Sequence, residues 1–558
     1  MNFLPFGGGA FLVEVEPGQA EVLWKALRQA ALPGVEELVP ATRSILIRLR
    51  PGTLRHRGPP EGAVPVANWD QLRRRIEALG AGLDRSIGPS EVAPVVMQVV
   101  YDGEDLAEVA RLSGVSAEEV VRRHVASTWT VGFLGFSPGF AYLEGGDPTL
   151  AVPRRAEPRA RVPAGSVALA AGMCAVYSQT TPGGWQLIGR TGAVLFDPKR
   201  RPPSLLAPGD RVRFEAVEDG PAGTGVAEPV YAIGSEMATP AASGARSSEA
   251  PDVEVVDPGP QTTVQDLGRI GWAHLGVPRS GAVDRGSLVR ANRLVGNPDG
   301  AAGLEATAVG PRLRFRVATT LAVTGAVGPI LVDGRPVPHS AAVPVPAGAE
   351  VHLAAFERGW RAYVALAGGV NAEVVLGSRS TDTLAGLGPP TLAAGAGFDL
   401  GSAGLPTGWS PVGGSPARDS RALATGPADL PLGARPALPN NGGAVEVGLA
   451  PGPRVDWIGD EGLDRMVASS WSVSATSDRT GMRLDGPGLA WVRPGEPHSE
   501  GMVAGAVQIP PAGLPIVLLA NHATTGGYPA VAVVGPSGLE VLAQCPPGTV
   551  IRFRLVST

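Results

Sequence analysis

Two stretches of the chain share one pattern, and together they indicate the fold. Residues 163–185 read PAGSVALAAGMCAVYSQTTPGGW, and residues 504–528 read AGAVQIPPAGLPIVLLANHATTGGY. Both contain small residues around a glycine, then an apolar strand, then Thr-Thr, Gly-Gly and an aromatic residue. Each is followed by Pro-Gly and a strand that ends in Arg-Phe, at 208–214 and 547–553. This internal repeat predicts related β-barrels in the two halves of the chain.

The sequence around these stretches has the same β character. From residue 128 to the end, short apolar runs with a period of two alternate with Gly and Pro, a pattern typical of barrels and sandwiches. A single helix is expected in this region, around Arg285–Leu294. The 77 Gly and 55 Pro residues disfavour long helices throughout.

The first 126 residues alternate between strand and helix patterns. Strand signals at 11–16 and 34–49 and helical spacing at 19–31 and 69–79 predict a small α+β module of βαββα order. Two short helices are expected within 104–126, with Ser116 and Glu119 forming a capping box. Their spacing also resembles a helix-turn-helix, but strand-like flanks and an acidic chain favour a helical hairpin docked on a sheet.

Two segments rich in Gly, Ala, Ser and Pro divide the chain. Residues 217–250 are typical of a linker, and residues 402–440 of a long loop or a second boundary. A length of 558 residues also suits three to four domains. The expected units are an N-terminal α+β module (1–88), a β-barrel (89–218), a linker (219–250), a β domain (251–430) and a second barrel (431–558).

Composition excludes several classes of function. The net charge is −5 with no long basic run, so nucleic-acid binding has little electrostatic support. There is no P-loop motif, and Lys25 and Lys199 are the only lysines. Cys174 and Cys545 lie too far apart in sequence for a cysteine zinc motif, and the seven histidines lack metal-ligand spacing, so no bound metal is expected. No signal peptide or 18-residue apolar run is present, which predicts a cytoplasmic protein without a membrane segment.

The paired-glycine loops are the first candidate for a binding site. Paired glycines permit positive φ, so successive N–H groups could point into one concavity and bind an oxyanion, a carboxylate or a phosphate. A tight turn between barrel strands is the alternative. The residues concerned are Thr181, Gly183, Gly184, Trp185, Thr524, Thr525, Gly526, Gly527 and Tyr528.

An aromatic cluster is the second candidate. Phe136, Phe140 and Tyr142 surround a Pro-Gly turn in a chain with only 5% aromatic residues. They could form the floor of a substrate pocket or a hydrophobic corner, and the sequence favours neither.

Polar residues in glycine-rich turns are the third candidate. Helix or turn capping accounts for many carboxylates in such turns. The guanidinium group binds carboxylates with two hydrogen bonds, although a surface ion pair is the commoner role of a single arginine. The candidates are Gln265, Asp266, Arg269, Asp284, Asp478, Arg479 and Arg483.

These motifs resemble those of a known family. FSPGFAYL at 136–143, VPAGSV at 162–167, TPGGW at 181–185 and LFDP at 195–198 are similar to the B subunit of 5-oxoprolinase, a family once called allophanate hydrolase subunits. Motifs in the second half resemble the C subunit: VQDLGR (264–269), GVPRSGAVD (276–284), LVGN (294–297), GSRST (377–381), SDR (477–479) and TTGGYP (524–529). The chain differs from the common family pattern at Met173-Cys174, Asn521 and Ala523.

The resemblance implies a mainly β protein with α+β content. It implies cyclophilin-like β-barrels in both halves and a small ferredoxin-like module at the start. It also implies an enzyme: the fused B and C subunits of an ATP-dependent 5-oxoprolinase, which converts 5-oxoproline to glutamate with a separate A subunit. ATP would bring its own Mg²⁺, and a homo-oligomer would be compatible with the family.

Two other functions follow from the same resemblance. The pair is similar to the carboxyltransferase region of biotin-dependent urea carboxylase, in which case a partner must supply the biotin carrier. It is also similar to an inhibitor and anti-inhibitor of a sporulation histidine kinase, and a fusion of these two would cancel itself.

For the 5-oxoprolinase function we expect one site shared by the two halves. The first half would supply the aromatic floor and His124 as a general base or proton shuttle, because the ordinary pKa of histidine lies near neutrality. A packing role in the core is the alternative for this histidine. The second half would supply Asp478, and Arg479 or Arg483 would hold the substrate carboxylate.

Overall fold

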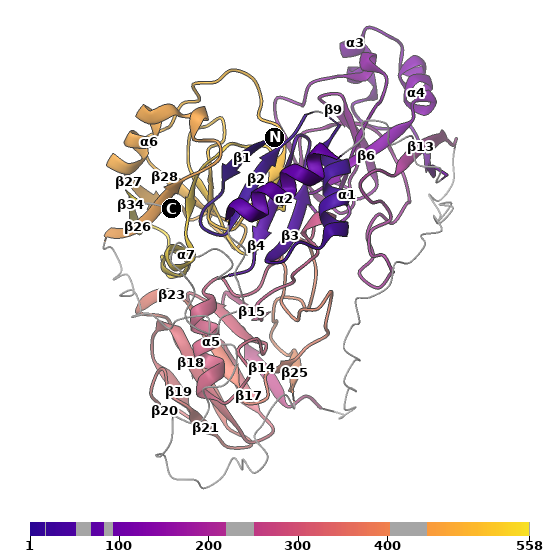
Figure 1. Ribbon diagram of the computed structural model, residues 1–558. Helices are drawn as coiled ribbons and strands as arrows, with labels where there is room; N and C mark the ends of the chain where they lie inside the picture. The colour runs from indigo at the N-terminus through magenta and orange to yellow at the C-terminus, as the bar shows by residue number, and fades with distance from the viewer. Residues whose placement is uncertain (17, 52–68, 83–92, 219–249, 402–443, 557–558) are drawn as a thin grey trace.

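The computed structural model describes residues 1–16, 18–51, 69–82, 93–218, 250–401 and 444–556. Two β-barrels lie side by side, with a small α+β module between them on the face shown in Figure 1 and a β-sandwich below. The expected boundaries near 88, 219–250 and 430 lie outside the described residues. Among the described residues, no helix is long and apolar enough to cross a membrane.

The N-terminal module is a four-stranded antiparallel sheet in the order β1-β2-β4-β3. Leu23 and Trp24 of its first helix and Ile76 of its second are buried against one sheet face. The opposite face packs on the last barrel, where Leu46 and Phe6 join Met502 in one apolar cluster. The sequence prediction omits β1. The elements are β1 (Asn2–Pro5), β2 (Ala10–Glu14), α1 (Ala20–Ala30), β3 (Val35–Pro40), β4 (Ser44–Leu49) and α2 (Trp69–Ala81).

The first barrel is a seven-stranded sheet in the order β12-β9-β10-β7-β6-β13-β5. A bridge between Val100 and Arg190 joins its two edges. The predicted helical hairpin docks on this sheet, and the Ser116 hydroxyl caps the second helix by accepting the Glu119 N–H at 3.2 Å. The elements are β5 (Val95–Val99), α3 (Leu106–Ser113), α4 (Ala117–Ala126), β6 (Trp129–Leu134), β7 (Ala141–Glu144), η1 (Pro148–Leu150), β8 (Arg159–Val162), β9 (Ser166–Ala170), β10 (Met173–Val176), β11 (Thr181–Gly183), β12 (Gln186–Arg190) and β13 (Arg211–Ala216).

The last barrel is closed and has the same strand arrangement as the first. Its order is β26-β33-β30-β31-β28-β27-β34, and in each barrel the first and last strands pair in parallel. The predicted repeat is therefore confirmed. Two helices that the sequence pattern does not predict, α6 and α7, belong to this barrel. The elements are β26 (Ala444–Pro451), η3 (Val455–Trp457), α6 (Gly459–Ala468), β27 (Ser470–Val473), β28 (Gly481–Asp485), β29 (Glu500–Gly501), β30 (Ala506–Gln508), β31 (Ile516–Leu518), β32 (Thr525–Gly526), β33 (Ala530–Val534), α7 (Pro536–Ala543) and β34 (Val550–Leu555).

The region between the barrels in sequence is a sandwich of two sheets. The sheets have the orders β20-β19-β22-β17-β14-β25-β24 and β15-β16-β23-β18-β21, and α5 packs on β18 and β23. The predicted helix at 285–294 is confirmed. The elements are β14 (Val253–Asp257), β15 (Gln261–Gln265), η2 (Ala273–Leu275), α5 (Arg285–Leu294), β16 (Gly303–Thr307), β17 (Arg312–Phe315), β18 (Thr319–Val327), β19 (Ile330–Val332), β20 (Arg335–Pro336), β21 (Val343–Val345), β22 (Glu350–Leu353), β23 (Arg358–Leu366), β24 (Val370–Asn371) and β25 (Gly397–Leu400).

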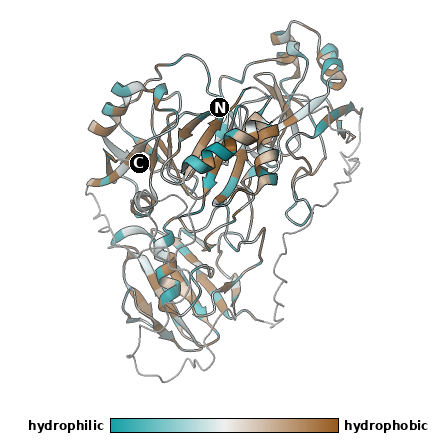
Figure 2. Cartoon of the chain, viewed as in Figure 1, coloured by the Kyte–Doolittle hydropathy of each residue, from teal (hydrophilic) through white to brown (hydrophobic). Residues whose placement is uncertain are grey.

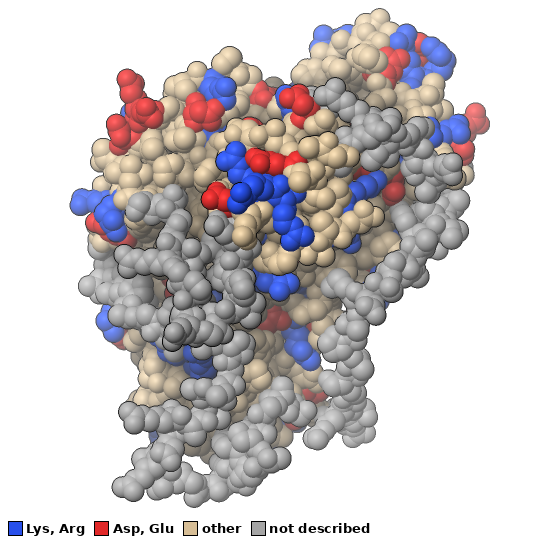
Figure 3. Space-filling model, viewed as in Figure 1, with Lys and Arg blue, Asp and Glu red and all other residues tan. Residues whose placement is uncertain are grey.

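Hydropathy and charge follow this architecture. Figure 2 shows mainly hydrophobic residues along the sandwich strands and mixed residues on helices such as α2 and α4. This is the pattern expected where sheets form the cores and amphipathic helices cover them. On the face shown in Figure 3, basic and acidic side chains are interspersed.

Candidate functional site at the junction of the two halves

Direct hydrogen bonds join the motif loops of the first barrel to the second half of the chain. The Phe136 N–H donates to Thr525 Oγ1 at 3.1 Å. The Gly139 N–H donates to the Leu275 carbonyl at 2.9 Å, and Gln179 Nε2 donates to the Leu384 carbonyl at 2.9 Å. The motif loops of the first barrel therefore lie against loops of both the sandwich and the last barrel.

The predicted aromatic cluster forms at this junction. Phe140 contacts Phe136, Tyr142, Tyr177 and Trp185, with ring centroids 5.0 to 6.1 Å apart. Phe136 has a φ of 62°, an uncommon backbone conformation for a bulky residue. The Thr525 contact described above holds the backbone there. The rings of this cluster are largely buried, so they form a tightly packed apolar surface, which we call the aromatic wall.

A group of polar side chains lies along this aromatic wall, and we call it the tyrosine site: Tyr142, Arg154, Tyr177, Ser499 and Thr525. The Tyr142 hydroxyl interacts with the Thr525 and Ser499 side chains. Burial raises the pKa of Tyr142 to about 12, and burial also raises the pKa of Tyr177, so both hydroxyls stay protonated. The Arg154 charge acts on both tyrosines.

Arg154 is the exposed member of the tyrosine site. Its guanidinium forms no ion pair or hydrogen bond with any residue that the structure describes. A Cβ placed on Gly527 would lie 4.0 Å from Arg154 Nη2 and 3.8 Å from Ser499 Oγ, so this cation from the first half lies beside the second paired-glycine loop. An unpaired guanidinium beside hydroxyl donors is suited to bind a carboxylate.

The two paired-glycine loops lie at the same junction, but they do not form the predicted nests. Gly183 belongs to strand β11 and Gly526 to strand β32, and none of the four paired glycines has a positive φ. Glycine is required at 183 because a Cβ there would lie 2.2 Å from the Tyr177 hydroxyl. At 526, a Cβ would lie 2.7 Å from Gln508 Nε2. Gly183 and Gly526 therefore allow close packing, whereas a Cβ on Gly184 or Gly527 would make only ordinary contacts, at 3.5 and 3.8 Å.

The other residues of these loops are the threonines, Trp185 and Tyr528, and their surroundings differ. The hydroxyls of Thr181 and Thr524 are buried and have no hydrogen-bond partner among the described residues. Trp185 lies in the aromatic cluster, and Tyr528 is 42% exposed at the end of the second loop. Gly184 accepts the Arg155 N–H through its carbonyl.

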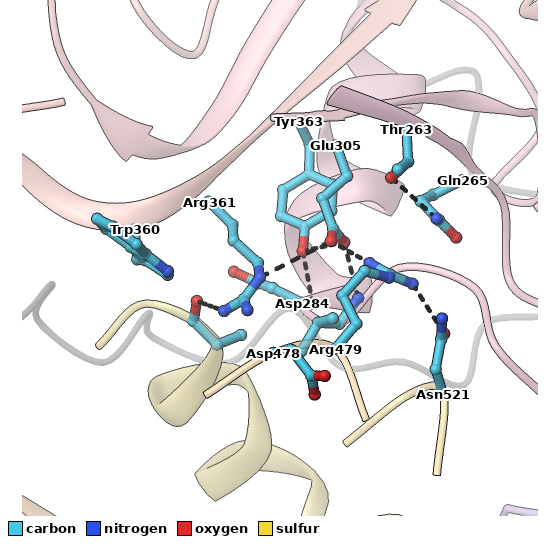
Figure 4. A network of polar contacts seen from close by, with 12 residues as sticks. Thr263, Gln265, Asp284, Glu305, Trp360, Arg361, Tyr363, Asp478, Arg479 and Asn521 are labelled. Atoms are coloured by element: carbon cyan, nitrogen blue, oxygen red, sulfur yellow. Dashed lines mark hydrogen bonds and ion pairs between the residues drawn. The ribbon is translucent and has the colours of Figure 1, made fainter. Parts of the chain in front are cut away.

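A buried ionic network joins the sandwich to the last barrel (Figure 4). Arg479 pairs with Glu305 on β16 and donates to the Gly281 carbonyl at 2.6 Å. Glu305 also accepts the Tyr363 hydroxyl at 2.8 Å, and its second arginine, Arg361, lies 3.8 Å away. These arginines hold the pKa of Glu305 below its usual range despite its burial.

This network corrects the prediction for Arg479. Its side chain is almost fully buried and committed to Glu305, so it is not available to bind a substrate carboxylate. Asp478 Oδ1 accepts the N–H groups of Thr480 and Gly481, so this predicted catalytic residue caps a turn. Arg483 is exposed on strand β28, whose neighbouring residues Met482 and Leu484 point into the barrel core.

The other predicted polar residues tie loops together. Asp266 accepts the Ser378 hydroxyl at 2.7 Å and the Arg379 N–H at 2.6 Å. Arg269 donates to the carbonyl and hydroxyl of Ser380, and Gln265 Nε2 donates to the Thr381 carbonyl at 3.0 Å. Asp284 caps α5, as the capping interpretation predicts. Together the Gln265, Asp266 and Arg269 contacts fix the 377–381 motif loop at the junction.

His124 lies in the core of the first barrel. It is fully buried, contacts Tyr101 Oη at 2.7 Å and Cys174 Sγ at 3.3 Å, and packs on Phe214. The Trp129 indole donates to the His124 carbonyl, and in the last barrel Trp471 donates in the same way to Met466. The repeat therefore uses methionine at the position equivalent to His124. This corrects the catalytic assignment, since a core position filled equally by methionine is a packing position.

Replacing His124 with methionine tests this interpretation. We expect a fully active protein whose free energy of unfolding falls by about 1 to 3 kcal/mol, because the swap keeps the buried volume but leaves the Tyr101 hydroxyl without its partner. The measurements are turnover in the complete enzyme mixture and urea unfolding. Loss of turnover in a stable variant would instead support a catalytic role for His124.

Buried histidines predict a specific loss of stability in acid. Burial lowers the pKa of His124 and His274 to about 3 and that of His522 to about 4. The unfolded chain binds protons at these sites near pH 6.5 while the native protein does not, so stability is complete above that pH and falls as the pH drops toward 4. Urea unfolding at a series of pH values measures the slope. The His124→Met variant should show a slope smaller by about one proton.

Sequence reasoning misses Arg154, Tyr177 and Ser499 of the tyrosine site. Arg154 stands in the arginine-rich run PRRAEPRAR, and nothing in that run distinguishes it from its neighbours. Tyr177 lies within the quoted repeat, and only its place against Phe140 and Gly183 shows its role. The contact between Thr525 and Phe136 spans 389 positions, beyond the reach of any local pattern.

Comparisons with known proteins divide the chain into the same two halves. The family model for carboxyltransferase domain subdomains C and D matches residues 1–206, and that for subdomains A and B matches residues 275–555. The chain is 39% identical to the 5-oxoprolinase B subunit of Escherichia coli O157:H7 over 222 residues, which are 38% of this chain and 95% of that protein. It is 34% identical to the 5-oxoprolinase C subunit of Escherichia coli K12 over 301 residues, which are 54% of this chain and 90% of that protein.

A solved structure has the same overall organisation. The crystal structure of TTHA0988 is 33% identical, with a TM-score of 0.77, and the match covers 98% of this chain and 99% of that one. The two family models follow one another along the chain, subdomains C and D first and subdomains A and B second. The chain therefore belongs to the carboxyltransferase-domain family, as a fusion of a part related to the 5-oxoprolinase B subunit with a part related to the C subunit.

Proposed function

We propose that this chain is the fused B and C component of an ATP-dependent 5-oxoprolinase. It would open the ring of 5-oxoproline to give glutamate, together with a separate A subunit of that enzyme. The observation that carries this proposal is the tandem match to relatives named as the B and C subunits of 5-oxoprolinase, of which the chain covers 95% and 90%.

The tyrosine site supports this substrate class. 5-Oxoproline carries one carboxylate and one amide carbonyl on a small ring. Arg154 can bind the carboxylate, because its guanidinium is exposed and unpaired among the described residues. The protonated hydroxyls of Tyr142 and Tyr177 belong to the buried side of this site, where Tyr142 interacts with Thr525 and Ser499. The rings of the aromatic cluster offer the apolar surface that the ring carbons need.

The described residues offer no cradle for the ATP phosphates in the paired-glycine loops. A phosphate nest needs successive N–H groups in a turn with positive φ, and none of the four paired glycines has a positive φ. We therefore assign no residue of this chain to ATP, and we propose that nucleotide use requires the A subunit.

The proposal is tested by reconstitution. The purified chain is mixed with the A subunit, ATP and 5-oxoproline, and glutamate and ADP are measured. We expect both products in equal amounts, and only in the complete mixture. If neither product exceeds the sum formed by the two proteins separately, the proposed function is wrong.

A carboxyltransferase component of a biotin-dependent carboxylase is the second candidate. The descriptions of the two matching family models favour it. The test is transfer of the carboxyl group from free carboxybiotin to urea and other amides. Transfer in the absence of the A subunit would favour this candidate over the first.

A further inference from the structure

The loop that carries Arg154 is held by one buried carboxylate. Asp105 lies directly before helix α3 and is 3% exposed. Its Oδ1 accepts Arg155 Nη1 at 2.7 Å, and the Arg159 guanidinium donates to both carboxylate oxygens at 2.9 Å. Arg155 directly follows Arg154, and Arg159 begins strand β8. Asp105 therefore binds both ends of a short segment, and we call residues 153–159 the arginine loop.

Asp105 is itself fixed to the first barrel. Its Oδ2 accepts the Leu187 N–H at 2.8 Å, and its own N–H donates to the Leu187 carbonyl at 2.9 Å. Leu187 belongs to strand β12, which pairs with β9. Despite its burial, the hydrogen bonds from Arg159 and Leu187 hold the pKa of Asp105 below its usual range, so the group is ionised at neutral pH. The arginine loop is thus bound to a charged group on a barrel strand.

The first paired-glycine loop holds the main chain on both sides of Arg154. The Gly184 carbonyl accepts the Arg155 N–H at 2.8 Å, and Gln186 Nε2 donates to the Pro153 carbonyl at 3.2 Å. The Arg154 guanidinium itself has no hydrogen bond or ion pair with any described residue. A fixed main chain that carries an unpaired cation is suited to hold a ligand at one place.

We propose that Asp105 is a positioning residue for the substrate carboxylate, because it fixes the arginine loop and so directs Arg154 to the tyrosine site. This inference rests on the proposed function. Among the described residues, no hydrogen bond or ion pair joins Asp105 to the tyrosine site, so its effect passes through the loop. Without this carboxylate, Arg155 and Arg159 would lose their shared acceptor and repel each other. The loop would then have to be ordered when the substrate binds, which weakens binding.

Replacing Asp105 with asparagine keeps the size of the side chain and an acceptor for the Leu187 N–H, but removes the charge. We expect KM for 5-oxoproline in the reconstituted mixture to rise about 10-fold, with kcat little changed, because a misplaced binding group weakens substrate binding. Asp102→Asn is the matched control. Asp102 pairs with Arg190 at 2.8 Å on the surface, and this pair does not involve the arginine loop.

A double variant separates positioning from a general structural effect. If Asp105 acts through Arg154, adding Asp105→Asn to Arg154→Gln should raise KM no further, because the group that Asp105 positions is already gone. Losses that multiply in the double variant, or a KM for Asp105→Asn within twofold of wild type, would overturn the proposal. If Asp105→Asn does not fold, Arg159→Gln replaces it in both comparisons, because it removes two hydrogen bonds to the carboxylate and leaves Arg155 bound.

Limited trypsin digestion of the chain alone measures the loop without enzyme activity. Trypsin cleaves after arginine, and mass spectrometry of the fragments identifies cuts after Arg154 and Arg155. We expect these cuts to be at least about fivefold faster in Asp105→Asn than in wild type or Asp102→Asn, because cleavage follows local opening. Equal cleavage rates would overturn the positioning role. Absence of glutamate from the complete wild-type mixture would instead refute the proposed function, so the two failures are distinguishable.

Discussion

Replacing Arg479 with alanine is expected to lower the free energy of unfolding by about 3 to 5 kcal/mol. The arginine pairs with Glu305 in a place where both side chains are 1% exposed. Removing it leaves a buried carboxylate that keeps only Arg361, 3.8 Å away, as a cation. The network joins the sandwich to the last barrel, so urea unfolding should show a lower midpoint for both.

Two further variants separate this effect from a general loss of positive charge. Arg483→Ala removes an exposed arginine four positions away and should change stability by less than about 0.5 kcal/mol. Adding Glu305→Gln to Arg479→Ala should restore part of the lost stability, because the uncompensated charge is gone. A stable Arg479→Ala protein that has lost only turnover would instead support the substrate-binding role that the sequence predicts.

The repeat is the strongest signal in the sequence, for a physical reason. Strand alternation and turn residues are local properties, and their recurrence in two distant stretches makes chance agreement improbable. The same local signals predict α1 to α5 closely. They miss strand β1 because NFLP is short and ends in proline. They miss helices α6 and α7 because Gly462, Gly538 and Pro536 resemble breaks, although proline is well tolerated in a first helical turn.

The candidate site is predictable from the sequence only in part. The sequence identifies loops that do meet at the junction, such as those of Phe136 and Thr525. It cannot distinguish a buried arginine from an exposed one, because Arg479 and Arg483 both flank the same glycine turn. Their different roles depend on Glu305, 174 positions away from Arg479. The prediction for the paired glycines is wrong because glycine serves both positive φ and close packing, and only the neighbouring Tyr177 decides between them.

Replacing Arg154 with glutamine is expected to reduce kcat/KM for 5-oxoproline about 30- to 100-fold, mostly through KM. A hydrogen-bonded charge on a carboxylate contributes about 2 to 3 kcal/mol, and the neutral amide keeps only the weaker hydrogen bond. The melting temperature should stay unchanged, because Arg154 is exposed and makes no ion pair with the described residues. Steady-state kinetics in the reconstituted mixture and thermal unfolding provide the two measurements.

A matched control separates the loss of Arg154 at the tyrosine site from a general loss of positive surface charge. Arg213→Gln removes an exposed arginine from β13 of the same barrel, so it changes the net charge equally without touching the tyrosine site. If both variants lose activity to the same degree, the cause is the overall charge of the surface. If only Arg154→Gln loses activity, a second substrate is tested: an amide that lacks the carboxylate. Wild type and variant should turn over this amide at equal rates, because it has no carboxylate for Arg154 to bind. Unchanged kinetics for Arg154→Gln would remove this arginine from the site, and the carboxylate would have to be held by another cation of the complex.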